Sequence, residues 1–247
     1  MSSYYRKSAP KKTVVKEFKV LIVSVIMFWV IEILDFVVFK GSLDRYGIQP
    51  HSLIGLRGIV FAPFLHGGFG HLIGNTIPFI TLGWLTMIQE TSDFYIVSLV
   101  SAIVGGIGVW IFGAPGSVHI GASIVIYGYL GFLLLRGYFQ KNVPSIALSL
   151  FVALAYGGLI WGVFPSEIGV SWQGHLFGFI GGAIAAKMIA QEKPKDSIPD
   201  GIEKLDEVLV KSVRVDADSP ITHSNLSKEE LAERNLGQDI PILLNYL

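Results

Sequence analysis

The chain of 247 residues contains no cysteine, carries no net charge and has few charged side chains. The absence of cysteine excludes disulfide bonds and thiolate metal sites. A formal net charge of zero gives no overall field that would attract nucleic acid, so no nucleic-acid partner is expected. Charged residues make up 15% of the chain, whereas soluble domains have about a quarter. This shortage argues against an ordinary soluble domain.

Long apolar runs take the place of the missing charges, which gather instead near the two ends of the chain. A bilayer core of about 30 Å needs roughly 20 mostly apolar residues in a helix. The runs show no alternation of polar and apolar residues, so helices are predicted rather than the strands of a barrel. Six segments meet or approach the required length, and they predict an all-α bundle of six transmembrane helices: Val20–Phe39, His71–Gln89, Phe94–Phe112, Ser123–Gln140, Val143–Phe164 and Gly174–Ala190.

The basic residues that flank these segments predict their orientation. They gather before the first segment, between the fourth and fifth, and after the sixth: Arg6, Lys7, Lys11, Lys12, Lys16, Lys19, Arg136, Lys141, Lys187, Lys193 and Lys195. Six spans would place all three groups in the cytoplasm. We therefore expect a multi-pass protein of the cell membrane with both termini cytoplasmic, and an uncleaved first helix rather than a signal peptide.

The membrane domain is predicted at 20–191, between a basic cytoplasmic segment at 1–19 and a charged, largely flexible cytoplasmic tail at 192–247. Within the tail, Ser227 with Glu230 three residues later predicts one short helix. The long first loop, 40–70, is partly apolar. It is either an ordinary extracytoplasmic loop or a segment lying in the membrane interface.

Strongly polar side chains stand at the start of the second, fourth and sixth predicted helices. His71 and Asn75 share one face of the second, Ser123 opens the fourth, and His175 lies in the first turn of the sixth. Three parallel helices entering from one side would bring these residues together at a similar depth. Each also has a simpler interpretation: Ser123 as a helix cap, His175 as an interface residue, and Asn75 as an interhelical hydrogen-bond partner.

Together these residues have the chemistry of acyl transfer. A serine hydroxyl needs a neighbouring base to become a nucleophile, and His175 is a candidate for that base. No acidic residue accompanies the cluster, so the expected arrangement is a dyad. Asn75, His71 and the Ser123 amide are candidate donors to an oxyanion. Tyr127, one turn after Ser123, is a candidate aromatic wall against the imidazole.

A glycine series in the sixth helix supports this convergence. Gly174, Gly178 and Gly182 form a face that lets another helix approach closely, next to His175. A zinc site from His66, His71 and His175 is the weaker alternative, because the His-Glu-x-x-His element of metalloproteases is absent. Neither a metal nor a cofactor is expected.

These motifs resemble the rhomboid intramembrane serine proteases. The resemblance covers the membrane portion and rests on His66 with His71 and Asn75, on Gly121-Ala122-Ser123, and on Gly174-His175 with its Gly-x-x-x-Gly continuation. It implies Ser123 as nucleophile, His175 as base, and His71, Asn75 and the Ser123 amide as the oxyanion site. It also implies supporting roles for Gly121, Tyr127 and His66. The expected substrates are single-pass membrane proteins in a lipid bilayer, cut near the extracytoplasmic end of the transmembrane segment.

The sequence departs from that family at two positions. Ile124 follows the serine where the family usually has glycine, and Leu56-Arg57 stands where a Trp-Arg pair is typical. Ile124 would either crowd the substrate or fill space left by small residues of the sixth helix. It also keeps open the alternative of a catalytically weak or inactive rhomboid-like protein that binds membrane helices. A small transporter is less favoured, because paired charges and an inverted repeat are not evident. The sequence does not predict an oligomeric state.

Overall fold

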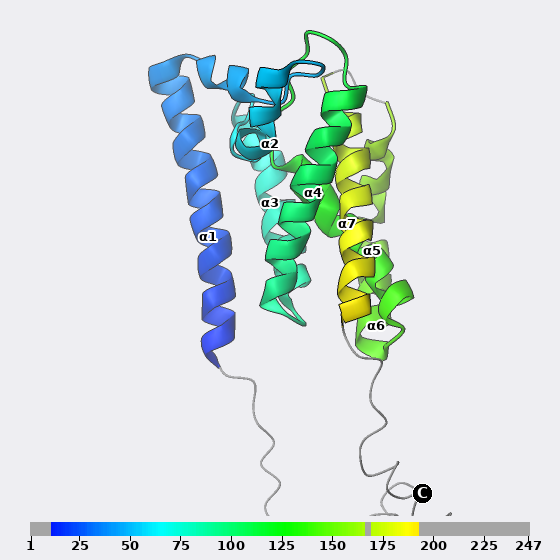
Figure 1. Cartoon of the computed structure of the whole chain (residues 1–247). Coiled ribbons are helices and arrows are strands. Elements are labelled where there is room, and N and C mark those ends of the chain that lie inside the picture. The colour runs from blue at the N-terminus through cyan, green and yellow to red at the C-terminus, as the bar shows by residue number, and fades with distance from the viewer. Residues whose placement is uncertain (1–10, 166–168, 193–247) are drawn as a thin grey trace, which may run out of the picture. The chain divides into compact units, whose positions relative to one another are not determined.

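The computed structural model describes residues 11–165 and 169–192, and these contain helices but no strands (Figure 1). The predictions for residues 1–10, for the tail from 193 and for the short helix near Ser227 lie outside the described residues. The helical elements are α1 (Lys11–Leu34), η1 (Asp35–Phe39), η2 (Ser42–Tyr46), η3 (Leu53–Arg57), α2 (Gly58–Phe61), η4 (Ala62–Phe64), α3 (Phe69–Met87), α4 (Thr91–Phe112), α5 (Ser123–Gln140), α6 (Val143–Tyr156), η5 (Gly157–Val163) and α7 (Trp172–Glu192).

Each of the six predicted apolar segments is helical. The starts of α5 and α6 agree with the sequence prediction, and α3 and α7 each begin two residues earlier than expected. The first helix differs most, because α1 begins at Lys11 and so includes part of the predicted basic segment. It continues as the π-helical turn η1, and the left-handed Lys40 and Gly41 then end the helix.

Helix α5 lies at the centre of the bundle. It packs against α3, α4, α6 and α7, and most of its side chains are buried. The predicted glycine face of the sixth segment makes the contact between α5 and α7. A Cβ atom on Gly178 would collide with the carbonyl oxygen of Ile124, and one on Gly182 with that of Gly128. The close approach predicted from these glycines is therefore confirmed.

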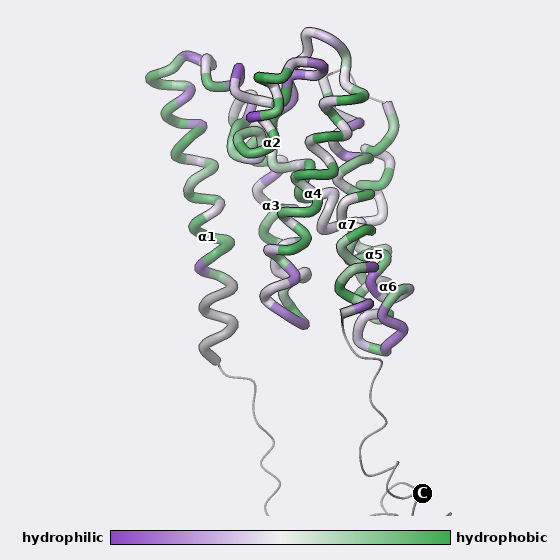
Figure 2. The backbone as a smooth tube through the Cα atoms, viewed as in Figure 1, coloured by the Kyte–Doolittle hydropathy of each residue, from purple (hydrophilic) through white to green (hydrophobic). Residues whose placement is uncertain are grey.

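Among the described residues, three helical segments are long and apolar enough to cross a membrane: Phe18–Phe39, Thr91–Phe112 and Val143–Val163. Leu53–Phe64 and Phe69–Met87 form a bent pair of helical segments. If this pair is counted as one span, the described residues hold up to four candidate spans. Their exposed surfaces are rich in large apolar side chains, as lipid contact requires, and hydrophilic residues concentrate toward the helix ends (Figure 2). Helices α5 and α7 fall outside this set. The buried position of α5 explains its polar and small residues, because a helix enclosed by other helices needs little apolar surface for lipid.

The first loop folds as a chain of short helices, η2 to η4, between α1 and α3. Several of its apolar side chains are exposed, including Leu53, Ile54 and Val60. Exposed apolar residues on short helical turns beside a membrane helix are typical of a segment that lies in the interface. The structure thus favours the interfacial alternative over an ordinary aqueous loop.

Candidate active site

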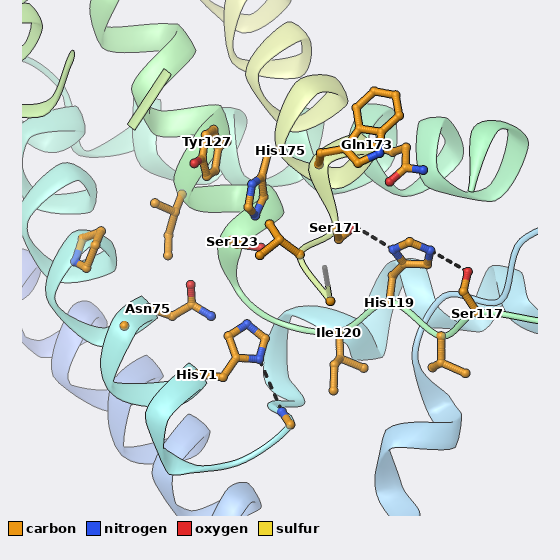
Figure 3. A pocket seen from close by; sticks show the side chains of 18 of the residues that line it. His71, Asn75, Ser117, His119, Ile120, Ser123, Tyr127, Ser171, Gln173 and His175 are labelled. Carbon is orange, nitrogen blue, oxygen red and sulfur yellow. Dashed lines mark hydrogen bonds between the residues drawn. The ribbon is translucent and has the colours of Figure 1, made fainter. Parts of the chain in front are cut away.

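The starts of α3, α5 and α7 meet around a cavity of about 880 Å³. Its lining brings together the four polar residues that the topology argument predicted, and Figure 3 shows them facing one another. In this view Ser123 lies between the ring of His175 and the side chains of His71 and Asn75. The lining residues that bear on the chemistry are His71, Asn75, Ser117, His119, Ser123, Tyr127, Ser171 and His175.

A tight turn delivers Ser123 to the cavity. Gly121 has a φ of +114°, which L side chains rarely adopt, and its N–H donates a 2.8 Å hydrogen bond to the carbonyl oxygen of Ala62. Helix α5 then begins at once with Ser123 in its first turn. The N–H groups of a first helical turn have no partner inside the helix. The Ser123 amide is therefore a donor that the α5 ladder leaves free.

Gly121 also sets the distance between this turn and α3. A Cβ atom on it would lie 2.7 Å from the Nε2 and Cε1 atoms of His71 and 3.3 Å from Nδ2 of Asn75. A side chain at this position would therefore push the α3 donors away from the segment that carries Ser123. The predicted supporting role of Gly121 has a steric basis in this contact.

His175 is held in one tautomer by its neighbours. Its Nδ1 atom lies 2.9 Å from the carbonyl oxygen of Gly162 in η5. A carbonyl can only accept, so Nδ1 carries the proton of the neutral ring and Nε2 keeps a lone pair. The Tyr127 ring stacks on the imidazole with centroids 4.0 Å apart and planes 7° apart. Its hydroxyl donates to the carbonyl oxygen of Leu159 at 3.0 Å, so the predicted aromatic wall is itself anchored.

The two α3 residues present donors to the same space. The backbone N–H of Gly67 donates to Nδ1 of His71 at 3.4 Å, which leaves the proton of the neutral ring on Nε2. Asn75 is 7% exposed, and its Nδ2 has no hydrogen-bond partner among the described residues. A buried amide nitrogen without a partner is uncommon in folded proteins and points to a role in binding.

His66 lies behind this layer rather than in it. It is 2% exposed, does not line the cavity, and packs its ring against His71 and Phe28 at centroid distances of 5.2 and 5.6 Å. His66 therefore contacts His71 and does not face the cavity. Among the residues that the structure describes, no group of three or more His, Asp or Glu side chains could hold a metal ion. The zinc alternative thus has no ligand set there.

The two departures from the family pattern lie outside the cavity. Ile124 is buried in a small cluster with Ile48, Ala62 and Val109 and faces the glycines of the neighbouring helices. This position favours the packing alternative for Ile124 over crowding of a substrate. Arg57 instead lies over the ring of Tyr46, with its Cζ atom 4.5 Å from the ring centroid.

Sequence reasoning missed the polar residues on the opposite wall of the cavity. His119 precedes α5, and Ser171 precedes α7. Both stand four residues before a predicted site residue, His119 before Ser123 and Ser171 before His175. This spacing of four residues could have suggested His119 and Ser171 as site residues, but the sequence does not indicate that their two segments are in contact.

Comparison with known proteins gives a consistent assignment. The rhomboid domain matches residues 55–192. "Uncharacterized protein Rv1337" of Mycobacterium tuberculosis is 39% identical over 184 residues, covering 71% of this chain and 76% of its own length. "Uncharacterized protein ML1171" of Mycobacterium leprae is 39% identical over 177 residues, covering 68% and 70%. "Putative rhomboid protease YdcA" of Bacillus subtilis is 29% identical over 133 residues, covering 53% and 66%. With the domain match spanning more than half of its length, the chain belongs to the rhomboid family.

Proposed function

We propose that the protein is an intramembrane serine endopeptidase in which Ser123 and His175 form the catalytic dyad. The observation that carries this proposal is the orientation of His175 by the Gly162 carbonyl, inside a cavity that Ser123 also lines. The carbonyl fixes the orientation and tautomer of the imidazole with Nε2 as the acceptor, which is one of the two roles of the carboxylate in a triad. The proposed site is therefore a dyad without an acidic partner.

The reaction follows from the positions of the donors and acceptors. Nε2 of His175 takes the Ser123 proton as Oγ attacks the scissile carbonyl carbon, and the imidazolium then gives that proton to the leaving amine. The negative charge on the tetrahedral intermediate is stabilised by His71 Nε2–H, Asn75 Nδ2 and the Ser123 amide. Water then hydrolyses the acyl-enzyme with His175 again as base. The cavity supplies room for this water and for the peptide.

The proposed substrates are transmembrane segments of single-pass proteins, cut near their extracytoplasmic end. A helical peptide bond is shielded by its own side chains and carbonyls, so the substrate segment unwinds locally in the cavity. The membrane character of the family supports this setting, together with the apolar surfaces of α1, α4 and α6. We also propose six spans, counting α5 and α7, in the cell membrane with both termini cytoplasmic.

The dyad is tested with Ser123→Ala, His175→Ala and the double variant. Each should abolish cleavage of a transmembrane substrate, and the double variant should be little worse than either, because the two residues act as one unit. A fluorophosphonate probe should label wild type and not Ser123→Ala. Tyr138→Ala, an exposed aromatic of α5 outside the cavity, serves as a control with wild-type activity. Substantial cleavage by folded Ser123→Ala would exclude the serine mechanism.

Topology has its own measurement. Reporter fusions after Glu192 should report the cytoplasm, whereas fusions near Gly116 should report the opposite side. The physical reason is the asymmetry of basic residues around the helices. A C-terminal reporter on the extracytoplasmic side would contradict the six-span proposal.

The alternative, an inactive rhomboid-like binder of membrane helices, drew on Ile124 beside the serine. That support weakens because Ile124 is buried in a packing cluster and does not line the cavity. The two functions differ in the probe experiment. A binder would leave Ser123 unlabelled in a well-folded wild-type protein.

A further inference from the structure

The wall of the cavity opposite α3 holds a second contact between a serine and a histidine. Nδ1 of His119 lies 2.6 Å from Oγ of Ser171, and Nε2 of the same ring lies 2.8 Å from Oγ of Ser117 (Figure 3). All three side chains line the cavity. The contact joins the segment before α5 to the segment before α7, which are far apart in the sequence.

The acceptor of the Ser117 hydroxyl determines the direction of both hydrogen bonds to His119. The Ser117 hydroxyl donates to the carbonyl oxygen of Ala114 at 2.6 Å. Its oxygen therefore accepts from Nε2–H of His119, which leaves Nδ1 of the neutral ring to accept from the Ser171 hydroxyl. Burial lowers the pKa of His119, in agreement with a neutral ring. Ser117 thus holds His119 in the tautomer that binds Ser171.

The position of this contact mirrors that of the dyad. His119 and Ser123 are four residues apart on one segment, and Ser171 and His175 are four residues apart on the other. In the His119–Ser171 pair the segment before α5 supplies the histidine, and in the dyad α5 supplies the serine. The α7 side supplies the opposite residue in each pair. The Ser171 carbonyl also accepts from the His175 amide at 3.1 Å, so Ser171 is tied directly to the first turn of α7.

His119 is fixed on its own side as well. Its backbone N–H and C=O exchange two hydrogen bonds with Ile48, each 2.9 Å long. Ile48 is completely buried, so the backbone of this segment has little freedom to shift. The His119–Ser171 bond therefore connects an anchored segment to the start of α7.

We propose that His119 and Ser171 are positioning residues that set the separation between Ser123 and His175. This inference rests on the proposed serine protease function. A hydrogen bond four residues before each member of the dyad fixes the relative depth of α5 and α7 at the site. Small displacements of reacting groups lower rates steeply, so loss of this bond should lower turnover more than substrate binding.

The test separates the two nitrogens of the His119 ring. In His119→Asn the side-chain amide reaches about the position of Nδ1 and can accept from Ser171. In His119→Gln the amide reaches about the position of Nε2 and keeps only the Ser117 contact. Ser171→Ala removes the partner directly, and Ser171→Thr restores a hydroxyl. Each is measured for kcat, KM, the rate of fluorophosphonate labelling at Ser123, and thermal unfolding.

We expect His119→Gln and Ser171→Ala to lose kcat about fivefold to tenfold, the range of one net hydrogen bond, with KM changed less than about twofold. Labelling of Ser123 should slow by a similar factor. His119→Asn and Ser171→Thr should recover most of the loss. The combination His119→Gln with Ser171→Ala should be no worse than either alone, because both remove the same bond.

Two results would overturn the inference. Equal kcat values in His119→Asn, His119→Gln and wild type would show that the bond does not position the dyad. Labelling of Ser171 in Ser123→Ala would make Ser171 a nucleophile instead of a positioning residue. Failure of the protease proposal is distinct from both, because wild type itself would then neither cleave nor be labelled.

Discussion

The two ends of α5 both carry buried polar side chains, yet they differ in what surrounds these groups. At the Ser123 end the polar residues line an open cavity, and the amide nitrogen of Asn75 has no partner among the described residues. At the other end, Arg136 is wholly buried and forms an ion pair of 2.8 Å with Asp93, which is 3% exposed. The first arrangement leaves hydrogen-bonding capacity for another molecule, and the second directs it inward.

The Arg136 end of α5 is called the closed end below, and the Ser123 end the open end. At the closed end, five side chains from α4, α5, α6 and the segment after α3 form a network. Nη2 of Arg136 donates to Gln89 at 2.6 Å, and Nε donates to Gln140 at 3.0 Å. Gln89 and Gln140 both reach the Ser145 hydroxyl, at 2.8 and 2.5 Å. Each of these side chains has at least one partner within the network, whereas Nη1 of Arg136 and Nε2 of Gln140 have none among the described residues. Their arrangement indicates a structural role.

Polarity inside a membrane protein therefore does not by itself mark a functional site. A buried charge in a membrane segment is normally treated as a functional candidate. Arg136 meets that criterion, but Nε and Nη2 of its guanidinium bind Asp93 and two glutamines. Ser123 and Asn75 carry no charge, yet they line the cavity. The environment of the group decides between the two roles.

The largest expected effect is on the stability of variants at the closed end. Arg136→Met should lower the free energy of unfolding by about 3–5 kcal/mol, because it leaves Asp93 buried without its cation. Adding Asp93→Leu should recover much of that loss, since an apolar pair of similar size is often neutral. Arg45→Met, at an exposed arginine, should stay within about 0.5 kcal/mol of wild type. Denaturant unfolding in detergent measures all three.

If the closed end is purely structural, the folded fraction of Arg136→Met should still be labelled at Ser123 at the wild-type rate. A protein that stays as stable as wild type but loses labelling would place Arg136 in the function and contradict the division between the two ends.

At the open end, substitutions should lower the cleavage rate and leave stability nearly unchanged. Asn75→Ala should lower kcat by about 10²–10³-fold, the usual cost of one oxyanion donor, and leave some activity because His71 and the Ser123 amide remain. Its stability should stay near that of wild type, since Nδ2 has no hydrogen-bond partner to lose within the described part of the chain. Asn75→Asp keeps the size of the side chain, removes the donor and should be at least as slow. A stability loss as large as that of Arg136→Met would make Asn75 structural.

Much of this architecture was predictable because the signals were local. Apolar length alone located all six long helices, and the start of α5 at Ser123 agreed with the sequence. Gly178 and Gly182 correctly predicted the close contact of α5 and α7. The convergence of Ser123 and His175 followed from helix order, since parallel helices that enter from one side place their first turns together.

The features that were missed depend on contacts between distant segments. Arg136 was read as a charge flanking a helix, but it lies inside α5, where Asp93 compensates its burial. His119 bonds to Ser171 and forms a backbone bridge with Ile48, and neither contact has a sequence signature. The short helices of the first loop were also missed, because such turns carry little intrinsic stability and form against their neighbours.

Ile124 gives the smallest and most discriminating prediction. Its side chain packs against Gly105 and Gly174, and a Cβ atom on Gly174 would lie 3.0 Å from Cγ1 of Ile124. Ile124→Val removes one buried methyl group and should cost about 0.5–1.5 kcal/mol of stability with an unchanged cleavage rate. Ile126→Val is the matched control, because Ile126 is equally buried but lines the cavity. That change should cost a similar amount of stability and should in addition alter the substrate range. Thermal unfolding and cleavage of substrates with small and large residues at the cut, measured on both variants, separate the two positions. Faster cleavage of large residues by Ile124→Val would restore the crowding explanation and place Ile124 among the residues that shape the site.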